Sequence, residues 1–298
     1  MPDLNLQDWQ NERKSISDAW LKFLGKGPKC REVSDFKILS SQAIGNCIRE
    51  KIQYNVYTGC TVEAYLIRPL KNSERYPGIV SLHEAIDCTI DEPAGIAGSP
   101  DLHIGLRLAE RGFVTINPRC FLWERDNATT GLKQQFPAWT GMGRMLWDAQ
   151  CAVDVLCSLA YVDEKLIGAI GHSLGGKEAF YLAAFDPRVK AAVSSEMGIG
   201  LDMSNWNEEH YLGAAVSLPG FSLSHHEVLA LIAPRPFLLI GGDSADGKLS
   251  DELYIRQVLY IYQLYDAESK IKFYNHHLKH SFPEEAQEAA YHWLEEWL

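Results

Sequence analysis

The sequence predicts an α/β fold built on a mostly parallel central sheet with helices packed on both faces. From residue 78 onward, short apolar runs alternate with longer stretches of helical periodicity, which is typical of a parallel sheet buried on both sides. Before that point, residues 46–57 and 60–68 alternate in polarity around Thr58-Gly59, which predicts a β-hairpin. We therefore expect one domain over residues 1–298, with antiparallel strands first and βα units afterwards.

The helices and strands are expected in a definite order. An amphipathic helix is predicted over residues 5–24 and is ended by Gly25 and Gly27-Pro28, so residues 1–30 form an N-terminal helical extension. The strands that follow the hairpin are expected at 78–82, 113–117, 166–170, 189–195, 236–240 and 270–275. The helices between and after them are expected at 102–111, 142–159, 174–185, 251–265 and 284–298.

Two stretches do not fit this alternation, residues 118–141 and 197–230. Irregular segments of this length inside a domain are usually functional or disordered, and their aromatic content favours order. We expect both to be lid-like insertions that line the site. Trp123 and Trp206 lie in them and are expected either to bind substrate by stacking or simply to pack the lid.

The composition excludes several classes of function. The chain has 28 Lys+Arg against 39 Asp+Glu and a net charge of −11, so neither nucleic acid nor an anionic membrane is expected as a partner. The seven cysteines form no C-x-x-C pair and no cluster with zinc-ligand spacing, so no metal is expected. The N-terminus lacks a basic region followed by an apolar core, and no apolar run approaches a membrane span. We expect a cytoplasmic protein, and nothing in the sequence predicts its oligomeric state.

The strongest motif is Gly171-His172-Ser173-Leu174-Gly175, which lies between a predicted strand and a predicted helix. In this context G-x-S-x-G forms a tight turn that exposes the serine hydroxyl above the sheet, and the glycines leave room for the turn. The amide of Leu174 is expected at the helix N-terminus, where it can stabilise a developing oxyanion. Ser173 is thus the predicted nucleophile.

With this motif the chain resembles the α/β-hydrolases, in particular the dienelactone-hydrolase-like and acetyl-xylan-esterase-like serine hydrolases. The resemblance covers roughly residues 60–298 and rests on residues 165–195, on ALIAPRPFLLIGGDSADG and on KHSFPEEAQEAAYHWLEEWL. It implies the α/β-hydrolase fold and hydrolysis of a small-molecule carboxylic ester through an acyl-enzyme, without a cofactor.

The general base is expected between the last strand and the last helix, because the α/β-hydrolase order places it there. That loop contains three histidines, and His280 is the best candidate since the family's His-x-Phe pattern falls on His280 and Phe282. Pro283 suits the first turn of the closing helix. His276 and His277 are expected to end the strand, one facing inward and one outward.

Two carboxylates remain open as the triad acid. Asp246 fits the family's arrangement after the strand at 236–240 and is favoured, with Asp243 as a turn former. Glu196 is the alternative because it ends the preceding strand. In a third arrangement, both acids share one imidazole.

The alternative acid is supported by a second resemblance, to glucuronoyl esterases. They carry a glutamate near the position of Glu196 and a lysine four residues after the serine, which Lys177 matches. They normally place an arginine directly after the serine, where this chain has Leu174. Lys177 is therefore a candidate substrate-binding residue.

The second oxyanion donor is expected after the strand at 78–82, where the chain reads His83-Glu84-Ala85-Ile86. This resembles the His-Glu-Ile-Phe stretch of dienelactone hydrolases, whose donor maps to the amide of Ala85. Glu84 is expected either to touch Ser173 or the substrate or to form a buried structural ion pair. Dienelactone hydrolases use a cysteine nucleophile, and Ser173 stands in its place.

The leading hypothesis is a carboxylesterase, with acetylated or uronate carbohydrate esters among its candidate substrates. The alternatives are a dienelactone or lactone hydrolase and a non-catalytic α/β-hydrolase homologue that acts as a binding protein.

Overall fold

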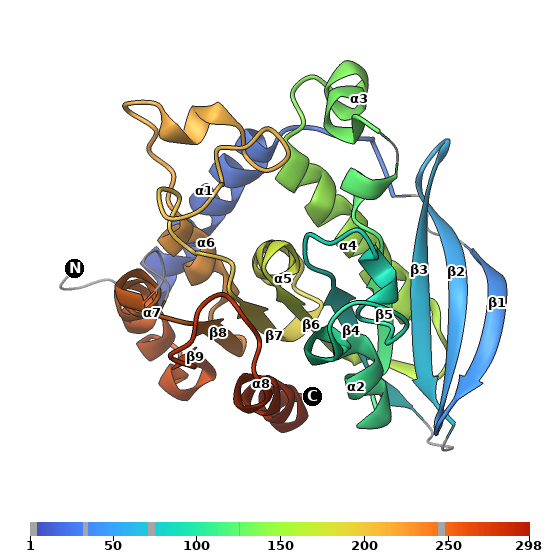
Figure 1. Ribbon diagram of the computed structural model, residues 1–298. Helices are drawn as coiled ribbons and strands as arrows, with labels where there is room; N and C mark the ends of the chain where they lie inside the picture. Colours follow the sequence, from blue (N-terminus) through green and yellow to red (C-terminus); the bar gives the residue numbers. More distant parts are fainter. Residues whose placement is uncertain (1–4, 32–34, 71–74, 125, 244–247) are drawn as a thin grey trace.

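A nine-stranded mixed sheet organises the chain, with strand order β1-β2-β3-β5-β4-β6-β7-β8-β9. The computed structural model describes residues 5–31, 35–70, 75–124, 126–243 and 248–298 (Figure 1). The strands are β1 (Phe36–Ile44), β2 (Cys47–Tyr57), β3 (Cys60–Pro69), β4 (Tyr76–Leu82), β5 (Val114–Pro118), β6 (Val162–His172), β7 (Val189–Ser195), β8 (Phe237–Gly241) and β9 (Ile271–Asn275).

The sheet has an antiparallel and a parallel part. β1, β2, β3 and β5 pair antiparallel, and the pairs from β5 through β9 are parallel. The hairpin expected around Thr58-Gly59 is β2–β3, and the βα units follow as expected. The carboxyl ends of β4, β6, β7, β8 and β9 therefore meet at one edge of the sheet, where α/β folds bind their ligands.

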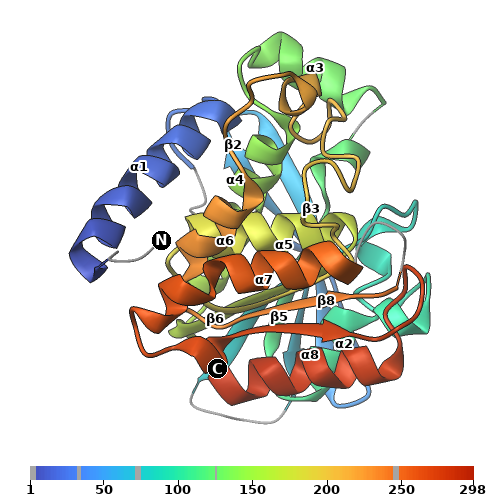
Figure 2. The ribbon, with the colours of Figure 1, turned by 90° about the vertical axis from the view of Figure 1, so that its left-hand side faces the viewer.

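Helices cover both faces of the sheet, as Figure 2 shows. They are α1 (Leu6–Leu24), α2 (Ile104–Glu110), α3 (Ala128–Gln135), α4 (Gly141–Ser158), α5 (Leu174–Phe185), α6 (His225–Ile232), α7 (Lys248–Gln263) and α8 (Glu284–Trp297). Helices α2 and α8 pack on one face, where Phe113, Ile170 and Trp293 share a core cluster. Helices α4, α5 and α7 pack on the other face, over the larger cluster, and α6 packs between α5 and α7.

Three elements were not predicted from the sequence. β1 was not predicted because its side chains are almost all exposed. A strand without a buried face does not show the alternation of apolar and polar residues by which strands are recognised. Helices α3 and α6 lie within the two stretches expected to be irregular. The sequence does carry a signal for the start of α6, the capping box formed by Ser224 and Glu227. In it the Ser224 amide donates to Glu227 Oε2 at 3.0 Å.

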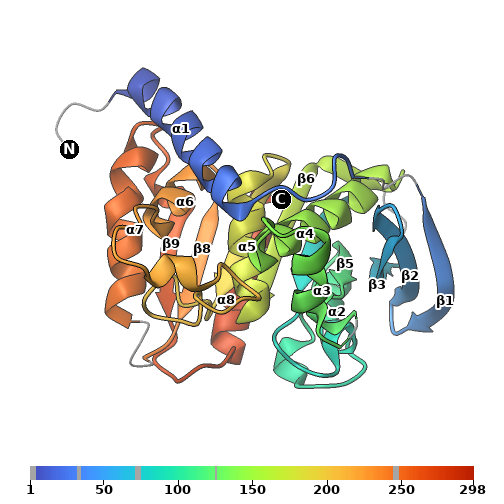
Figure 3. The ribbon, with the colours of Figure 1, turned by 90° about the horizontal axis from the view of Figure 1, so that it is seen from above.

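The N-terminal helix α1 lies across α6, away from the sheet (Figure 3). Its Trp20 is fully buried, stacks on His225 with ring centroids 5.5 Å apart, and meets Tyr181 edge to face. The indole Nε1 of Trp20 donates to Glu227 Oε2 at 3.3 Å. These contacts make the helical extension part of the packed core. No helix within the described ranges combines the length and the apolar character that a membrane span requires.

Replacing Trp20 with alanine is expected to lower the free energy of unfolding by about 3–5 kcal/mol, because it empties a fully buried indole site. Leu21→Ala is the matched control: its side chain is 45% exposed, so a change within about 0.5 kcal/mol is expected. Urea unfolding of both variants measures the difference. Equal stability of the two variants would mean that α1 is not integral to the core.

Candidate active site

The predicted strand–turn–helix is present at Ser173. Strand β6 ends at His172, helix α5 begins at Leu174, and Ser173 between them has φ 55° and ψ −114°. A positive φ is costly for a residue with a side chain and is concentrated at functional sites. The Ser173 amide donates to the carbonyl of Ser195 at 2.8 Å, which holds the turn against the end of β7.

The glycines of the motif are required by close backbone contacts. A Cβ on Gly171 would lie 2.2 Å from the carbonyl of Gly175, and a Cβ on Gly175 would lie 2.1 Å from the carbonyl oxygen of Leu82. Neither position therefore has room for a side chain. The start of α5 consequently packs directly on the end of β4, which brings the loop after β4 beside Ser173.

Glu196 follows β7 and also has a positive φ, 53°. Its amide donates to the carbonyl of Ile240 at 2.9 Å, and its side chain is 5% exposed. One carboxylate oxygen, Oε1, lies 2.7 Å from Nε2 of His276, and Oε2 lies 3.3 Å from Nδ1 of His280. The buried carboxylate thus contacts two imidazoles at once.

His280 is the more exposed of these two histidines, with 52% of its side chain accessible. The hydrogen bond with Glu196 raises the pKa of His280, as do the charges of Glu196 and Glu84, whereas partial burial and the nearby Lys177 act in the opposite direction. His280 and Ser173 line the same cavity. Its Nδ1 is directed at a carboxylate, which is the arrangement a general base needs.

His276 and His277 lie as the sequence predicts. His276 is buried against Glu196, and His277 is exposed, with its Nδ1 3.4 Å from the carboxylate of Asp243. Asp243 also accepts a hydrogen bond from Asn275 at 2.9 Å. Asp246, the favoured acid, lies outside the described residues.

The two expected oxyanion donors come from different elements, the start of α5 and the loop after β4. Leu174 is the first residue of α5, so its amide has no acceptor within the helix. Ala85 is exposed and lines the cavity together with Ser173. His83 anchors the Ala85 loop, because its Nε2 accepts from the Cys120 amide at 3.0 Å and its Nδ1 lies 2.6 Å from the Glu84 carbonyl. Burial lowers the pKa of His83 to about 4, so this imidazole is neutral.

Glu84 extends toward the histidines and does not form a fully buried ion pair. Its Oε2 lies 3.9 Å from Nε2 of His172, and its side chain is 23% exposed. Burial lowers the pKa of His172 to about 3, and the neighbouring His280 and His276 act in the same direction. Glu84, His172 and His280 each offer one ligand atom, all within 4.8 Å of one another. They are the side chains here that could hold a metal ion.

Lys177 is buried one turn into α5 and faces the cavity. Its Nζ donates to Ser204 Oγ at 2.7 Å and lies 3.9 Å from the ring centre of Trp206 and 4.8 Å from that of Tyr211. Burial lowers its pKa to about 7. The aromatic rings partly replace the lost hydration of the ammonium group by cation–π attraction.

These groups surround a cavity of about 320 Å³. It is lined by Ala85, Ser173, Lys177, Glu196, Gly198, Met203, Ser204, Asn205, Tyr211, Asp251 and His280. The insertion at 197–230 thus contributes to the wall, whereas no described residue of 118–141 does so.

The two tryptophans do not form the expected stacking wall. Trp206 is fully buried, donates its indole N–H to the Gly198 carbonyl at 2.7 Å, and lies beneath Lys177. Its expected contact with substrate is corrected, because a ring with no exposed surface cannot stack on a ligand. Trp123 packs edge to face on His83 and is not among the lining residues.

The sequence analysis missed Ser204, Tyr211 and Asp251 as parts of this site. They come from the irregular stretch after β7 and from α7, far along the chain from Ser173. No local pattern identifies such residues, because only the tertiary fold places them together.

Comparison with known proteins bears on the family resemblance and on the fold. Residues 62–195 match the model of the dienelactone hydrolase family, which confirms the resemblance over that part of the chain. The chain is also 28% identical over 199 residues to "Putative hydrolase YtaP" of Bacillus subtilis (strain 168), a match that covers 60% of this chain and 64% of that protein.

Solved structures share the fold along nearly the whole chain. A glucuronoyl esterase from Solibacter usitatus superposes with a TM-score of 0.78 at 17% identity, over 99% of this chain and 94% of that one. A "putative acetyl xylan esterase" from Bacteroides fragilis NCTC 9343 gives 0.72 at 15% identity, over 92% of this chain and 77% of that one. The expected α/β-hydrolase fold is confirmed.

Gly175→Ala is expected to destabilise the protein by about 3 kcal/mol or more, because the new Cβ would collide with the backbone of β4. Gly59→Ala is the control: it has φ 77° and nothing within 4 Å of its added Cβ, so only the backbone strain of about 1–2 kcal/mol is expected. Thermal and urea unfolding compare the two. A smaller loss for Gly175→Ala than for Gly59→Ala would contradict the close packing of the turn.

Proposed function

We propose that this chain is a serine hydrolase that cleaves carboxylic esters through an acyl-enzyme intermediate. The observation that carries the proposal is the strained Ser173, which shares one cavity with a histidine whose Nδ1 lies against the buried carboxylate of Glu196. A serine hydroxyl needs such a base, and the base needs such an orienting partner.

In the proposed reaction, Ser173 Oγ attacks the ester carbonyl carbon while His280 takes the hydroxyl proton. The amides of Leu174 and Ala85 donate to the oxyanion that forms. His280 then returns the proton to the leaving alcohol, which breaks the ester bond and leaves the acyl group on Ser173. Water, deprotonated by His280, attacks the acyl-enzyme carbonyl, and His280 then returns the proton to Ser173 Oγ as the bond to the acyl group breaks and the carboxylic acid leaves. All the groups used belong to this chain.

We assign Glu196 as the triad acid. Its Oε2 lies 3.3 Å from His280 Nδ1, and its other oxygen is held by His276 at 2.7 Å. The carboxylate is therefore fixed in the position that orients His280 and stabilises its protonated form. Asp246 is the competing assignment from the sequence, and the variant experiment below separates the two.

For the substrate we propose a carbohydrate ester. The polar wall of the cavity, made of Lys177, Ser204 and Asn205, suits an ester whose acid or alcohol part carries oxygen atoms. The names of the two structural neighbours point to glucuronoyl and acetyl-xylan esters. The ammonium of Lys177 favours the glucuronoyl kind, because a uronate ester presents several oxygens close to the scissile bond. Lactone hydrolysis and ligand binding without catalysis are the competing functions.

Ser173→Ala is expected to reduce ester hydrolysis at least about 10³-fold, because the nucleophile is lost, and to abolish labelling by a fluorophosphonate. Ser158→Ala, at the far end of α4, should behave as wild type. Acetate release from acetylated xylo-oligosaccharide and methanol release from methyl glucuronate identify the preferred ester. A folded wild-type protein that labels on no serine and cleaves no ester would leave only the binding function.

Glu196→Gln is expected to lower kcat by about 10²–10⁴-fold and to move the acid limb of the kcat/KM profile to lower pH. The direction follows because Glu196 raises the pKa of His280, so its removal makes the imidazolium a stronger acid. Asp243→Asn and Asp246→Asn should leave both the rate and the acid limb nearly unchanged. If Asp246→Asn carries the loss instead, Asp246 is the triad acid.

A further inference from the structure

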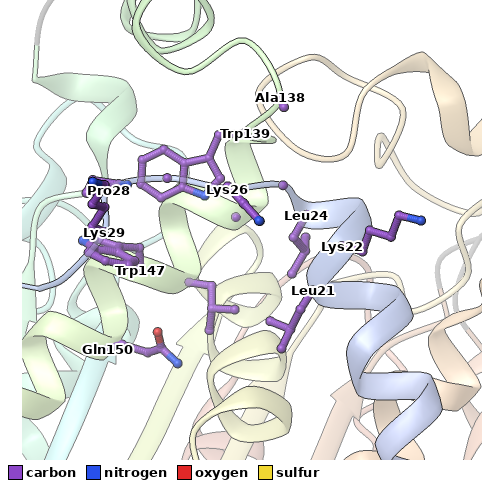
Figure 4. Close-up of a pocket in the computed structure, with 14 residues that line it drawn as sticks. Leu21, Lys22, Leu24, Lys26, Pro28, Lys29, Ala138, Trp139, Trp147 and Gln150 are labelled. Carbon is purple, nitrogen blue, oxygen red and sulfur yellow. The ribbon is translucent and has the colours of Figure 1, made fainter.

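A second and larger cavity, of about 770 Å³, lies away from the catalytic cavity and shares no lining residue with it. It is formed by the last turn of α1, the chain at 25–29 and the first half of α4 (Figure 4). Its lining consists of Leu21, Lys22, Leu24, Gly25, Lys26, Gly27, Pro28, Lys29, Ala138, Trp139, Gly143, Leu146, Trp147 and Gln150. This volume is within the range of small-molecule sites.

The base of this cavity is apolar and aromatic. Trp139 and Trp147 meet edge to face with ring centroids 6.0 Å apart, and Leu21 and Leu24 lie on the α1 side of the cavity (Figure 4). Trp139 is buried beneath the chain at Gly27, so Trp147 is the ring that a ligand can contact. The indole N–H of Trp147 donates to the Val56 carbonyl at 2.8 Å, so the orientation of that ring is fixed without a ligand. Leu21 is 45% exposed, which leaves apolar surface open to water.

The rim carries only positive charge. Lys22, Lys26 and Lys29 line the cavity, and the lining contains no Asp or Glu. All three lysines are exposed, and none of them forms an ion pair within the described part of the chain. The carboxylate of Asp154, one turn beyond Gln150 on α4, does not neutralise these lysines. It already forms ion pairs with Arg31 at 2.8 Å and with Arg188 at 2.5 Å. In a chain of net charge −11, such a local cluster favours an anionic ligand.

We propose that this cavity binds an aromatic carboxylate. The flat ring would lie against the partly exposed Trp147, where aromatic groups pack edge to face or offset. The carboxylate would lie near Lys26 and Lys29, which follow α1 along the rim, whereas the Lys22 side chain extends from the other side of α1 (Figure 4). The ligand is bound and not transformed, so the inference stands whether or not the chain is an esterase.

The test uses 2-naphthoate as the probe, with binding measured by isothermal titration calorimetry on the full chain. One site is expected, and 2-naphthamide, which has the same shape without the charge, should bind at least tenfold more weakly. The triple variant Lys22→Gln/Lys26→Gln/Lys29→Gln should lose at least tenfold in affinity for 2-naphthoate. The matched control Lys37→Gln/Lys165→Gln/Lys190→Gln, on exposed lysines elsewhere, should bind as wild type.

Further variants locate the probe and exclude misfolding. Leu21→Gln alters only an exposed wall residue and should weaken binding without loss of stability. Lys177→Met should leave the affinity unchanged, because Lys177 belongs to the catalytic cavity. Equal binding of the amide, full binding by the first triple variant, loss of binding in Lys177→Met, or no binding at millimolar probe would each overturn the proposal.

Discussion

The site depends on one backbone hydrogen bond, from the Ser173 amide to the Ser195 carbonyl. It continues the parallel pairing of β6 and β7, in which His172 lies opposite Ser195. Because this register places the end of β7 beside Ser173, the residue that follows this strand, Glu196, leaves the sheet close to the serine. The sheet itself therefore sets the spacing between Ser173 and Glu196, and both residues carry the positive φ that such abrupt exits require.

The buried carboxylate of Glu196 gives its two imidazoles different roles. His276 is buried and occupies one oxygen at 2.7 Å, whereas His280 is half exposed and lies 3.3 Å from the other. A buried carboxylate held by one partner keeps its orientation when the second partner moves. In the proposed mechanism, His280 can therefore follow a proton between the serine and a leaving group while His276 holds the carboxylate of Glu196 in place.

The sequence predicted the parts of this site that are encoded locally. The turn at Ser173 was predictable because strand, glycines and helix follow one another within a few residues, and His280 was predictable from its place before Pro283. The contact between Glu196 and His280 was not predictable, because it depends on the tertiary pairing that brings the end of β7 beside the loop after β9. The two roles expected for Trp206, stacking on substrate or packing, could not be separated for a similar reason: the sequence of an irregular stretch does not reveal whether an aromatic residue in it is buried. Strand β1 has no buried face and left no pattern to detect.

The buried ammonium of Lys177 couples the catalytic cavity to the proton concentration of the solution. Burial brings its pKa to about 7, so near neutrality the side chain exists in comparable amounts with and without its proton. An anion that enters the cavity stabilises the charged form, and the protein must then take up part of a proton from the buffer. The heat of binding an anionic ligand, such as the carboxylate product, therefore includes the ionisation heat of the buffer, and it differs between buffers at the same pH.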